Sequence, residues 1–76
     1  MLSWRYYKVM KDLWFIDKDE DIWKVSEDYS CCTIYYKHND YTKSTSWETT
    51  KKNFIYCKRM YKLKEISEGD AFLEIL

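Results

Sequence analysis

Aromatic side chains dominate this chain and limit the folds open to it. Its 76 residues include four Trp, eight Tyr and three Phe, against one Gly and no Pro. These rings favour pleated, half-buried surfaces, and each buries a large apolar area at a low cost in side-chain entropy. The sequence therefore predicts a small, aromatic-rich β domain. The surplus of rings also indicates that some of them face a partner.

The chain length predicts one domain, residues 1–76. A domain of this size buries only roughly 60% of its unfolded surface, so its stability is marginal. Leu, Ile, Val and Phe make up only about a fifth of the chain, near the composition of disordered proteins. Because Trp and Tyr supply the missing apolar area, we expect the chain to fold, either alone or as part of an oligomer.

Turn signals recur every eight to twelve residues or so, the spacing typical of a small all-β barrel or sandwich. We therefore predict a compact antiparallel meander of five to seven strands. The expected strands lie near residues 4–9, 13–17, 22–28, 31–37, 53–60, 61–66 and 71–76. Residues 41–47 are polar and form either an exposed edge strand or part of a long loop.

Two segments also fit helices. Residues 49–66 have Thr49 or Thr50 as a potential N-terminal cap, and apolar residues follow at helical spacing. The tail could form a short helix with Ser67 and Asp70 as a capping pair. We favour strands for both segments, with the tail paired back through a turn at Gly69. The alternative fold class is α+β, with a helix in 49–66 or at the C-terminus.

Strand alternation predicts the core. Side chains alternate between the two faces of a strand, so only one of Trp14 and Phe15 should be fully inside. The expected core residues are Trp14, Phe15, Ile16, Trp23, Val25, Ile34, Tyr36, Phe54 and Ile55.

The charges cancel overall but are segregated along the chain. Thirteen basic residues balance thirteen acidic ones. Residues 12–28 and 65–76 are acidic, whereas residues 37–64 carry eight bases and two acids. Such segregation indicates either complementary strands that pair across a sheet or two faces of opposite sign. We favour complementary strands.

Two groups of residues imitate metal sites. Asp17, Asp19 and Asp21 have the acid spacing of a calcium loop, but Ile22 occupies the position where that loop needs Gly. We interpret this segment as a solvated hairpin turn. The other group, the three cysteines and His38, lacks a Cys-x-x-Cys pair, and adjacent cysteines on a strand point to opposite faces. We expect no metal and no cofactor.

No catalytic motif stands out, so we expect a protein that is not an enzyme. The chain has one histidine, and phosphate-binding loops need more glycine than it contains. It shows no signal peptide pattern and no apolar run long enough to span a membrane. The odd cysteine count argues against a disulfide framework. We therefore expect a cytoplasmic protein with reduced, buried thiols.

Recognition of another protein is the function we favour. Tyr41 and Trp47 are large rings in the most polar part of the chain, as interface anchors often are. The equally weighted alternative is that both pack inward from an edge strand. The predicted partner-binding residues are Tyr41, Trp47, Lys43, Lys51 and Lys52. Open strand edges also favour self-association, so a homodimer is a further expectation.

The second function considered is binding of single-stranded nucleic acid or a nucleotide through residues 37–64. This stretch combines eight cations with several rings, and stacked bases beside lysines are typical of such sites. The Lys/Ile/Tyr/Asp-rich, Pro-free composition resembles that of short proteins from low-GC bacteria and their phages. Many of those proteins inhibit host enzymes or defence systems stoichiometrically, which the resemblance implies here.

Overall fold

The computed structural model describes residues 11–76, so the strand expected near residues 4–9 lies outside the described part. Five strands and two α-helices follow one another along the chain. The strands are β1 (Leu13–Ile16), β2 (Ile22–Val25), β3 (Cys31–Tyr35), β4 (Ser44–Glu48) and β5 (Lys64–Ile66). The helices are α1 (Lys51–Met60) and α2 (Glu68–Ile75), and a 3-10 turn, η2 (Lys37–Asn39), precedes β4.

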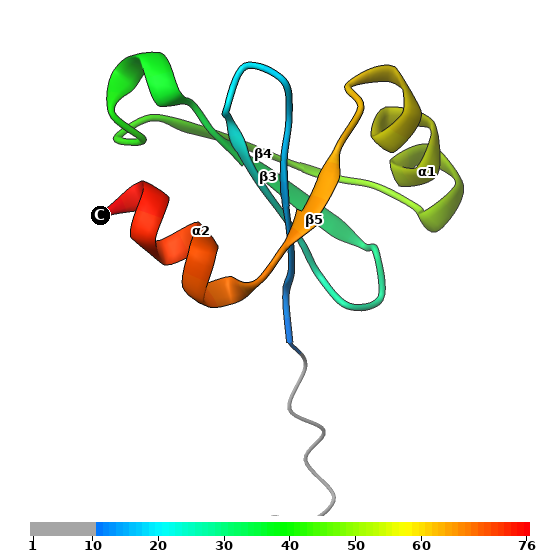
Figure 1. Ribbon diagram of the computed structural model, residues 1–76. Helices are drawn as coiled ribbons and strands as arrows, with labels where there is room; N and C mark the ends of the chain where they lie inside the picture. Colours follow the sequence, from blue (N-terminus) through cyan, green and yellow to red (C-terminus); the bar gives the residue numbers. More distant parts are fainter. Residues whose placement is uncertain (1–10) are drawn as a thin grey trace, which may run out of the picture.

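The strands form one sheet in the order β4-β3-β2-β1-β5, and every neighbouring pair is antiparallel. Strands β1 to β4 make a meander, in which each strand pairs with the next. The chain then passes through α1 from β4, at one edge, to β5, at the other (Figure 1). The antiparallel meander is confirmed, but it forms a single open sheet with β4 and β5 as its edges, so the predicted barrel or sandwich is wrong.

The structure matches the α+β alternative more closely than the all-β prediction. Residues 51–60 and 68–75 are helical, where we favoured strands. Both helices begin at the caps that the alternative named. The Thr50 side chain accepts a hydrogen bond from the backbone N–H of Asn53 at 3.2 Å, and Ser67 accepts one from that of Asp70 at 3.0 Å. These caps satisfy backbone donors that a helix start otherwise leaves unpaired.

Helix α1 ends abruptly because Lys62 adopts a left-handed conformation, with φ 53°. The backbone N–H of Leu63 then donates to the carbonyl of Lys58, and that of Lys62 donates to the carbonyl of Arg59. This pair of bonds is the Schellman arrangement, which closes a helix C-terminus and normally uses glycine. It turns the chain so that Leu63 is buried and β5 begins directly afterwards.

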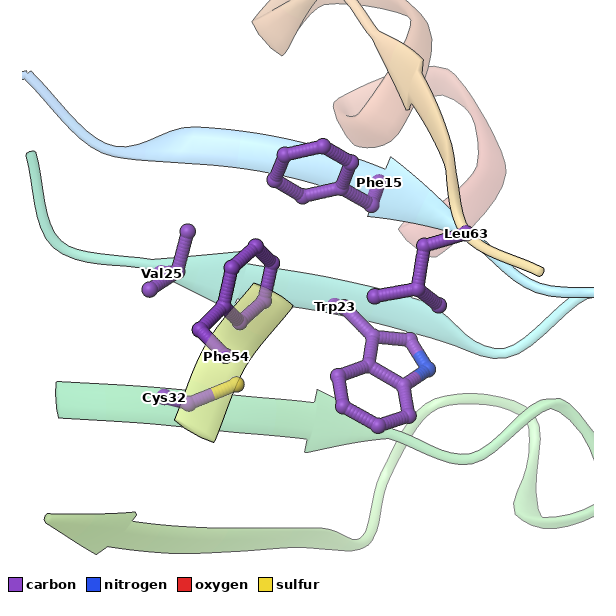
Figure 2. Close-up of a cluster of buried hydrophobic side chains, with 6 residues drawn as sticks. All are labelled: Phe15, Trp23, Val25, Cys32, Phe54 and Leu63. Carbon is purple, nitrogen blue, oxygen red and sulfur yellow. The ribbon is translucent and has the colours of Figure 1, made fainter. Parts of the chain in front are cut away.

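The two helices cover opposite faces of the sheet, so the molecule has three layers (Figure 1). Under α1, Phe54 packs above the central strands with Phe15, Trp23 and Val25 (Figure 2). Cys32 and Leu63 complete that cluster. Under α2, a smaller cluster contains Trp14, Ile22 and Ala71. The core is therefore divided by the sheet into two parts.

This division corrects the predicted core. Trp14 and Phe15 point to opposite faces and both are buried, because each face has its own helix. Trp23, Val25 and Phe54 are buried as expected. Ile55 is 42% exposed, because it lies on the outer side of α1. The remaining three predicted core residues, Ile16, Ile34 and Tyr36, are half-buried.

The two helices carry charges of opposite sign. Residues 51–64, which include α1, contain six bases and no acid, and α2 contains three acids and no base. Within residues 11–76 the only ion pair joins Lys37 Nζ to Glu20 Oε2, at 2.6 Å. This ion pair joins the acidic segment 12–28 to the basic segment 37–64, whereas the two helices keep charges of opposite sign on opposite sides of the sheet.

Candidate protein-binding surface

The outer face of α1 combines exposed apolar side chains with cations. We define it as Lys52, Ile55, Tyr56, Arg59 and Met60, the residues on the side of the helix away from buried Phe54. Tyr56 is 63% exposed and Met60 is 58% exposed. Lys52 lies four residues before Tyr56 and Arg59 three residues after it, so the two cations flank this ring on the helix surface.

The other two cations of α1 are directed toward rings nearer the sheet. Lys51 Nζ lies 5.7 Å from the centroid of the Tyr29 ring, and Lys58 Nζ lies 5.6 Å from that of Phe15. Lys52 and Arg59 have no ion-pair partner among residues 11–76. They remain available to an anionic group on a partner.

The charge at the start of α1 does not help the helix to form. The first turn contains Lys51 and Lys52 and no acid. The N-terminal end of a helix carries a partial positive charge, so cations placed there cost a few tenths of a kcal/mol. Lys51 has a partner in the Tyr29 ring, but stability of the helix does not account for Lys52.

Helix α2 also has exposed apolar residues, but its charge is opposite. Leu73 is 79% exposed, whereas Phe72 packs its ring edge-on against Trp14 at a centroid distance of 5.5 Å. Glu68, Asp70 and Glu74 give this helix three negative charges. The two helices therefore offer apolar surfaces of different electrostatic character on opposite sides of the sheet.

Tyr41 is a half-buried residue near the β1–β2 turn. Its hydroxyl donates a hydrogen bond of 2.8 Å to the backbone carbonyl of Glu20, and the ring packs against the cluster under α2. Burial, followed by the negative charge of Glu74, raises the pKa of this phenol above its usual value. The backbone of Tyr41 is itself left-handed, with φ 60°. The residue connects the β3–β4 loop to the first hairpin.

Trp47 is half-buried on the α1 side of the sheet. Its ring meets that of Trp23 edge-on, with centroids 5.8 Å apart and an interplanar angle of 84°. The ring packs against the core, as one of the two equally weighted expectations for Trp47 had it, while its role as an interface anchor stays a prediction. Lys43, just before β4, and Lys51 and Lys52 are exposed.

The five predicted binding residues do not form one patch. Trp47, Lys51 and Lys52 lie around the junction of β4 and α1, whereas Tyr41 and Lys43 lie at the opposite end of β4. Their roles in binding stay predictions. The sequence did not predict the outer face of α1, because the segment was expected to be a strand with Ile55 in the core. The N-terminal cap at Thr50 was the sequence signal that could have indicated a helix here, and with it the exposed outer face.

The acidic turn between β1 and β2 is a structural feature of the hairpin. Asp17 Oδ1 accepts hydrogen bonds from the backbone N–H groups of Asp19 and Asp21, at 2.8 and 3.0 Å. Asp17 Oδ2 accepts one from the indole N–H of Trp23 at 2.9 Å. The carboxylate therefore stabilises the turn and satisfies a buried donor, as the interpretation of this segment as a hairpin turn implies.

An open depression of about 680 Å³ adjoins this turn. It is lined by Asp19, Asp21, Tyr36, Lys37, His38 and Asp40. The backbone N–H of Lys37 donates to Asp21 Oδ1 at 2.8 Å, and the Lys37 ammonium pairs with Glu20. This hydrogen bond to Glu20 raises the pKa of Lys37. Polar groups on the depression thus join the first hairpin to the β3–β4 loop.

The sulfur atoms and the histidine are spread over the sheet. Cys31 is exposed, whereas Cys32 is buried in the cluster under α1, with Cys57 packed against that cluster. Cys31 and Cys32 are consecutive strand residues and point to opposite faces. His38 lies beyond the other end of β3, beside Tyr36. The structure therefore does not bring the four residues together.

Comparison with known proteins identifies no relative. No family model matches the chain, and no curated protein or solved structure matches it significantly. In the part of the chain that the structure describes, neither helix is long and apolar enough to cross a membrane.

Proposed function

We propose that this protein is a non-enzymatic protein-binding module that uses the outer face of α1. The observation that carries the proposal is the exposure of Ile55, Tyr56 and Met60 beside the cations Lys52 and Arg59. Exposed apolar side chains that cluster on a small protein mark interaction sites. Tyr and Arg are also among the residues that contribute most to binding at protein interfaces.

The side chains of this face indicate what surface a partner would need. A matching surface would offer an apolar recess for Tyr56 and carboxylates for Lys52 and Arg59. Opposite charges at the rim would speed the encounter, while the central ring would supply most of the affinity. Stoichiometric inhibition of a bacterial enzyme or defence system in the cytoplasm, which the resemblance to short phage and bacterial proteins implies, would use such a surface to cover an acidic site.

Nucleic-acid binding is the second candidate, and one observation favours it. Residues 51–64 carry six cations without an acid, and exposed Tyr56 offers a ring on which a base could stack. Against it, the acidic turn and α2 together would repel a phosphate backbone over much of the remaining surface. Salt separates the two candidates, because phosphate contacts release counterions and lose affinity steeply as salt rises.

Site-specific photo-crosslinking tests the proposal. A photoreactive phenylalanine analogue replaces Tyr56, and the purified protein is irradiated in a lysate of the cells that naturally produce it. We expect one protein adduct that resists nuclease and is competed by unlabelled protein. Adding Lys52→Glu and Arg59→Glu should abolish the adduct, whereas the matched reversal Lys18→Glu, on the β1–β2 turn, should leave it unchanged.

Two results would contradict the proposal. An adduct that disappears on nuclease treatment would identify nucleic acid as the ligand. A probe at position 56 that gives no adduct, while the same probe at exposed Leu73 on α2 gives one, would place the binding surface on the opposite face of the sheet.

A further inference from the structure

Strand β4 is an open edge of the sheet. It pairs with β3 on one side, and all its residues except Trp47 are exposed. Trp47 packs against the cluster under α1, but no strand among residues 11–76 pairs with the far side of β4. Edge strands are usually protected by a proline, a bulge or a central charge. In β4 the only charge is Glu48, at its end.

The hydrogen bonds next to β4 show which of its backbone groups are free. The N–H of Tyr36 donates to the carbonyl of Lys43, and the N–H of Thr49 donates to that of Ser30. In an antiparallel pair, hydrogen-bonded residues alternate with residues whose N–H and C=O point away. Residues 43, 45, 47 and 49 therefore bond to β3. Ser44, Ser46 and Glu48 direct their N–H and C=O groups outward.

These three residues are symmetric about Ser46, and we infer that β4 pairs with β4 of a second copy of the chain. A two-fold axis through Ser46 places Ser46 opposite the Ser46 of the second copy and Ser44 opposite Glu48. Each of the three residue pairs then exchanges two backbone hydrogen bonds. The result is a continuous ten-stranded sheet with a self-complementary interface, as two-fold dimers require.

The side chains agree with this register. Glu48 meets Ser44, whose hydroxyl can donate to its carboxylate, and no two like charges lie directly opposite each other. On the α1 side of the sheet, each Trp47 lies opposite a Thr45, so the ring gains a second neighbour beside Trp23. Aromatic and β-branched residues are favourable cross-strand pairs. A shift of the axis to Thr45 or Trp47 would form only two of the three hydrogen-bonded pairs.

This inference goes beyond the proposed function and does not depend on it. The axis runs perpendicular to the sheet, so both copies of α1 lie on the same face of the dimer and keep their outer faces uncovered. A ladder of five residues buries less area than stable dimers usually do. We therefore expect a reversible dimer whose population rises with protein concentration.

Charge complementation at position 46 tests the axis directly. Because this residue faces itself across the dimer, Ser46→Lys and Ser46→Asp should each weaken self-association by roughly fivefold or more. An equimolar mixture of the two variants should form heterodimers at least as readily as the unmodified chain forms homodimers. Sedimentation velocity over a concentration series measures all three samples. Heterodimer formation also shows that both variants are folded, although each loses the 2.8 Å hydrogen bond between Ser46 and Thr33.

A second variant tests the register away from the axis. Ser44→Lys should strengthen self-association, because the new ammonium lies opposite Glu48 of the second copy. The inference is wrong if the unmodified chain is monomeric at every concentration at which it stays soluble. It is equally wrong if both charges at position 46 leave a dimer unchanged, or if the mixture associates no better than either variant alone.

Discussion

Replacing Asp17 with Ala should destabilise the protein far more than its place in a surface turn implies. Its carboxylate accepts three hydrogen bonds, two from the backbone of its own turn and one from the indole of Trp23. Trp23 is only 1% exposed and belongs to the cluster under α1. Removing the carboxylate therefore leaves a donor in the core without its acceptor.

The magnitude follows from these three bonds. An unsatisfied buried donor costs about 1–3 kcal/mol, and each turn bond contributes about 0.5 kcal/mol or more, since water can replace part of it. The expected loss is about 2–4 kcal/mol. At about 0.05–0.15 kcal/mol per residue, the whole chain has a stability of roughly 4–11 kcal/mol. The single carboxylate of Asp17 therefore accounts for a large share of the free energy of unfolding.

Urea unfolding followed by tryptophan fluorescence measures this loss. Asp17→Asn should retain the two turn bonds through its carbonyl oxygen but present an amide donor to the Trp23 N–H, so it should lose about 1–3 kcal/mol. Asp19→Ala is the matched control, because only the backbone N–H of Asp19 takes part in the turn. It should change stability by less than about 0.5 kcal/mol. Equal losses for Asp17→Ala and Asp19→Ala would refute the reasoning.

Four further variants probe the core, the outer side of α1 and its C-terminal end. Phe54→Ala should cost about 3–5 kcal/mol in urea unfolding, whereas Ile55→Ala, on the exposed side of the same helix, should cost less than about 1 kcal/mol; similar losses would contradict the observed helix orientation. Burial, with smaller contributions from Cys57 and Cys31, raises the pKa of the Cys32 thiol from its ordinary 9.0 to about 12. The contribution of the neutral Cys32 thiol to stability is therefore full below pH 9.0 and declines toward pH 12. The difference in free energy of unfolding between the unmodified chain and Cys32→Ala should shrink over that range of pH. A difference that stays constant with pH would contradict this prediction. Lys62→Gly should raise the stability by about 0.5 kcal/mol, because glycine adopts the left-handed conformation without strain, and a lower melting temperature would contradict this.

The central strands were predictable because their patterns are local. Residues 13–17, 22–28 and 31–37 each contain the strand that the alternation of side chains indicated. The turn at Asp17 was predictable for the same reason, since a cluster of acidic residues between two apolar runs favours a solvent-exposed turn. Both helix caps, Thr50 and Ser67, were also visible as alternatives.

The helices were harder to assign because their ends carry weak signals. Helix α1 ends at Met60, and the left-handed residue that closes it, Lys62, is a position at which the sequence has no glycine. Without that signal, the apolar residues from Phe54 to Leu63 fit a period of two or of 3.6 about equally well. The outer face of α1 depended on this choice, since Ile55 points inward in one arrangement and outward in the other. Long-range packing, which one sequence does not reveal, decided between them.

The burial of β1 on both faces has a consequence for how the protein is made. Phe15 packs against Phe54, and Trp14 packs against Ala71, and both partners are synthesised later than β1. The first strands therefore leave the ribosome with neither side covered. The hairpins can form early, because their contacts are local, but they expose rings until the C-terminal third of the chain has emerged. Exposed apolar surface in such intermediates promotes aggregation. A stop codon at position 68 would remove only α2, yet it would leave the surface around Trp14 and Ile22 open and make the truncated product a substrate for chaperones and proteases.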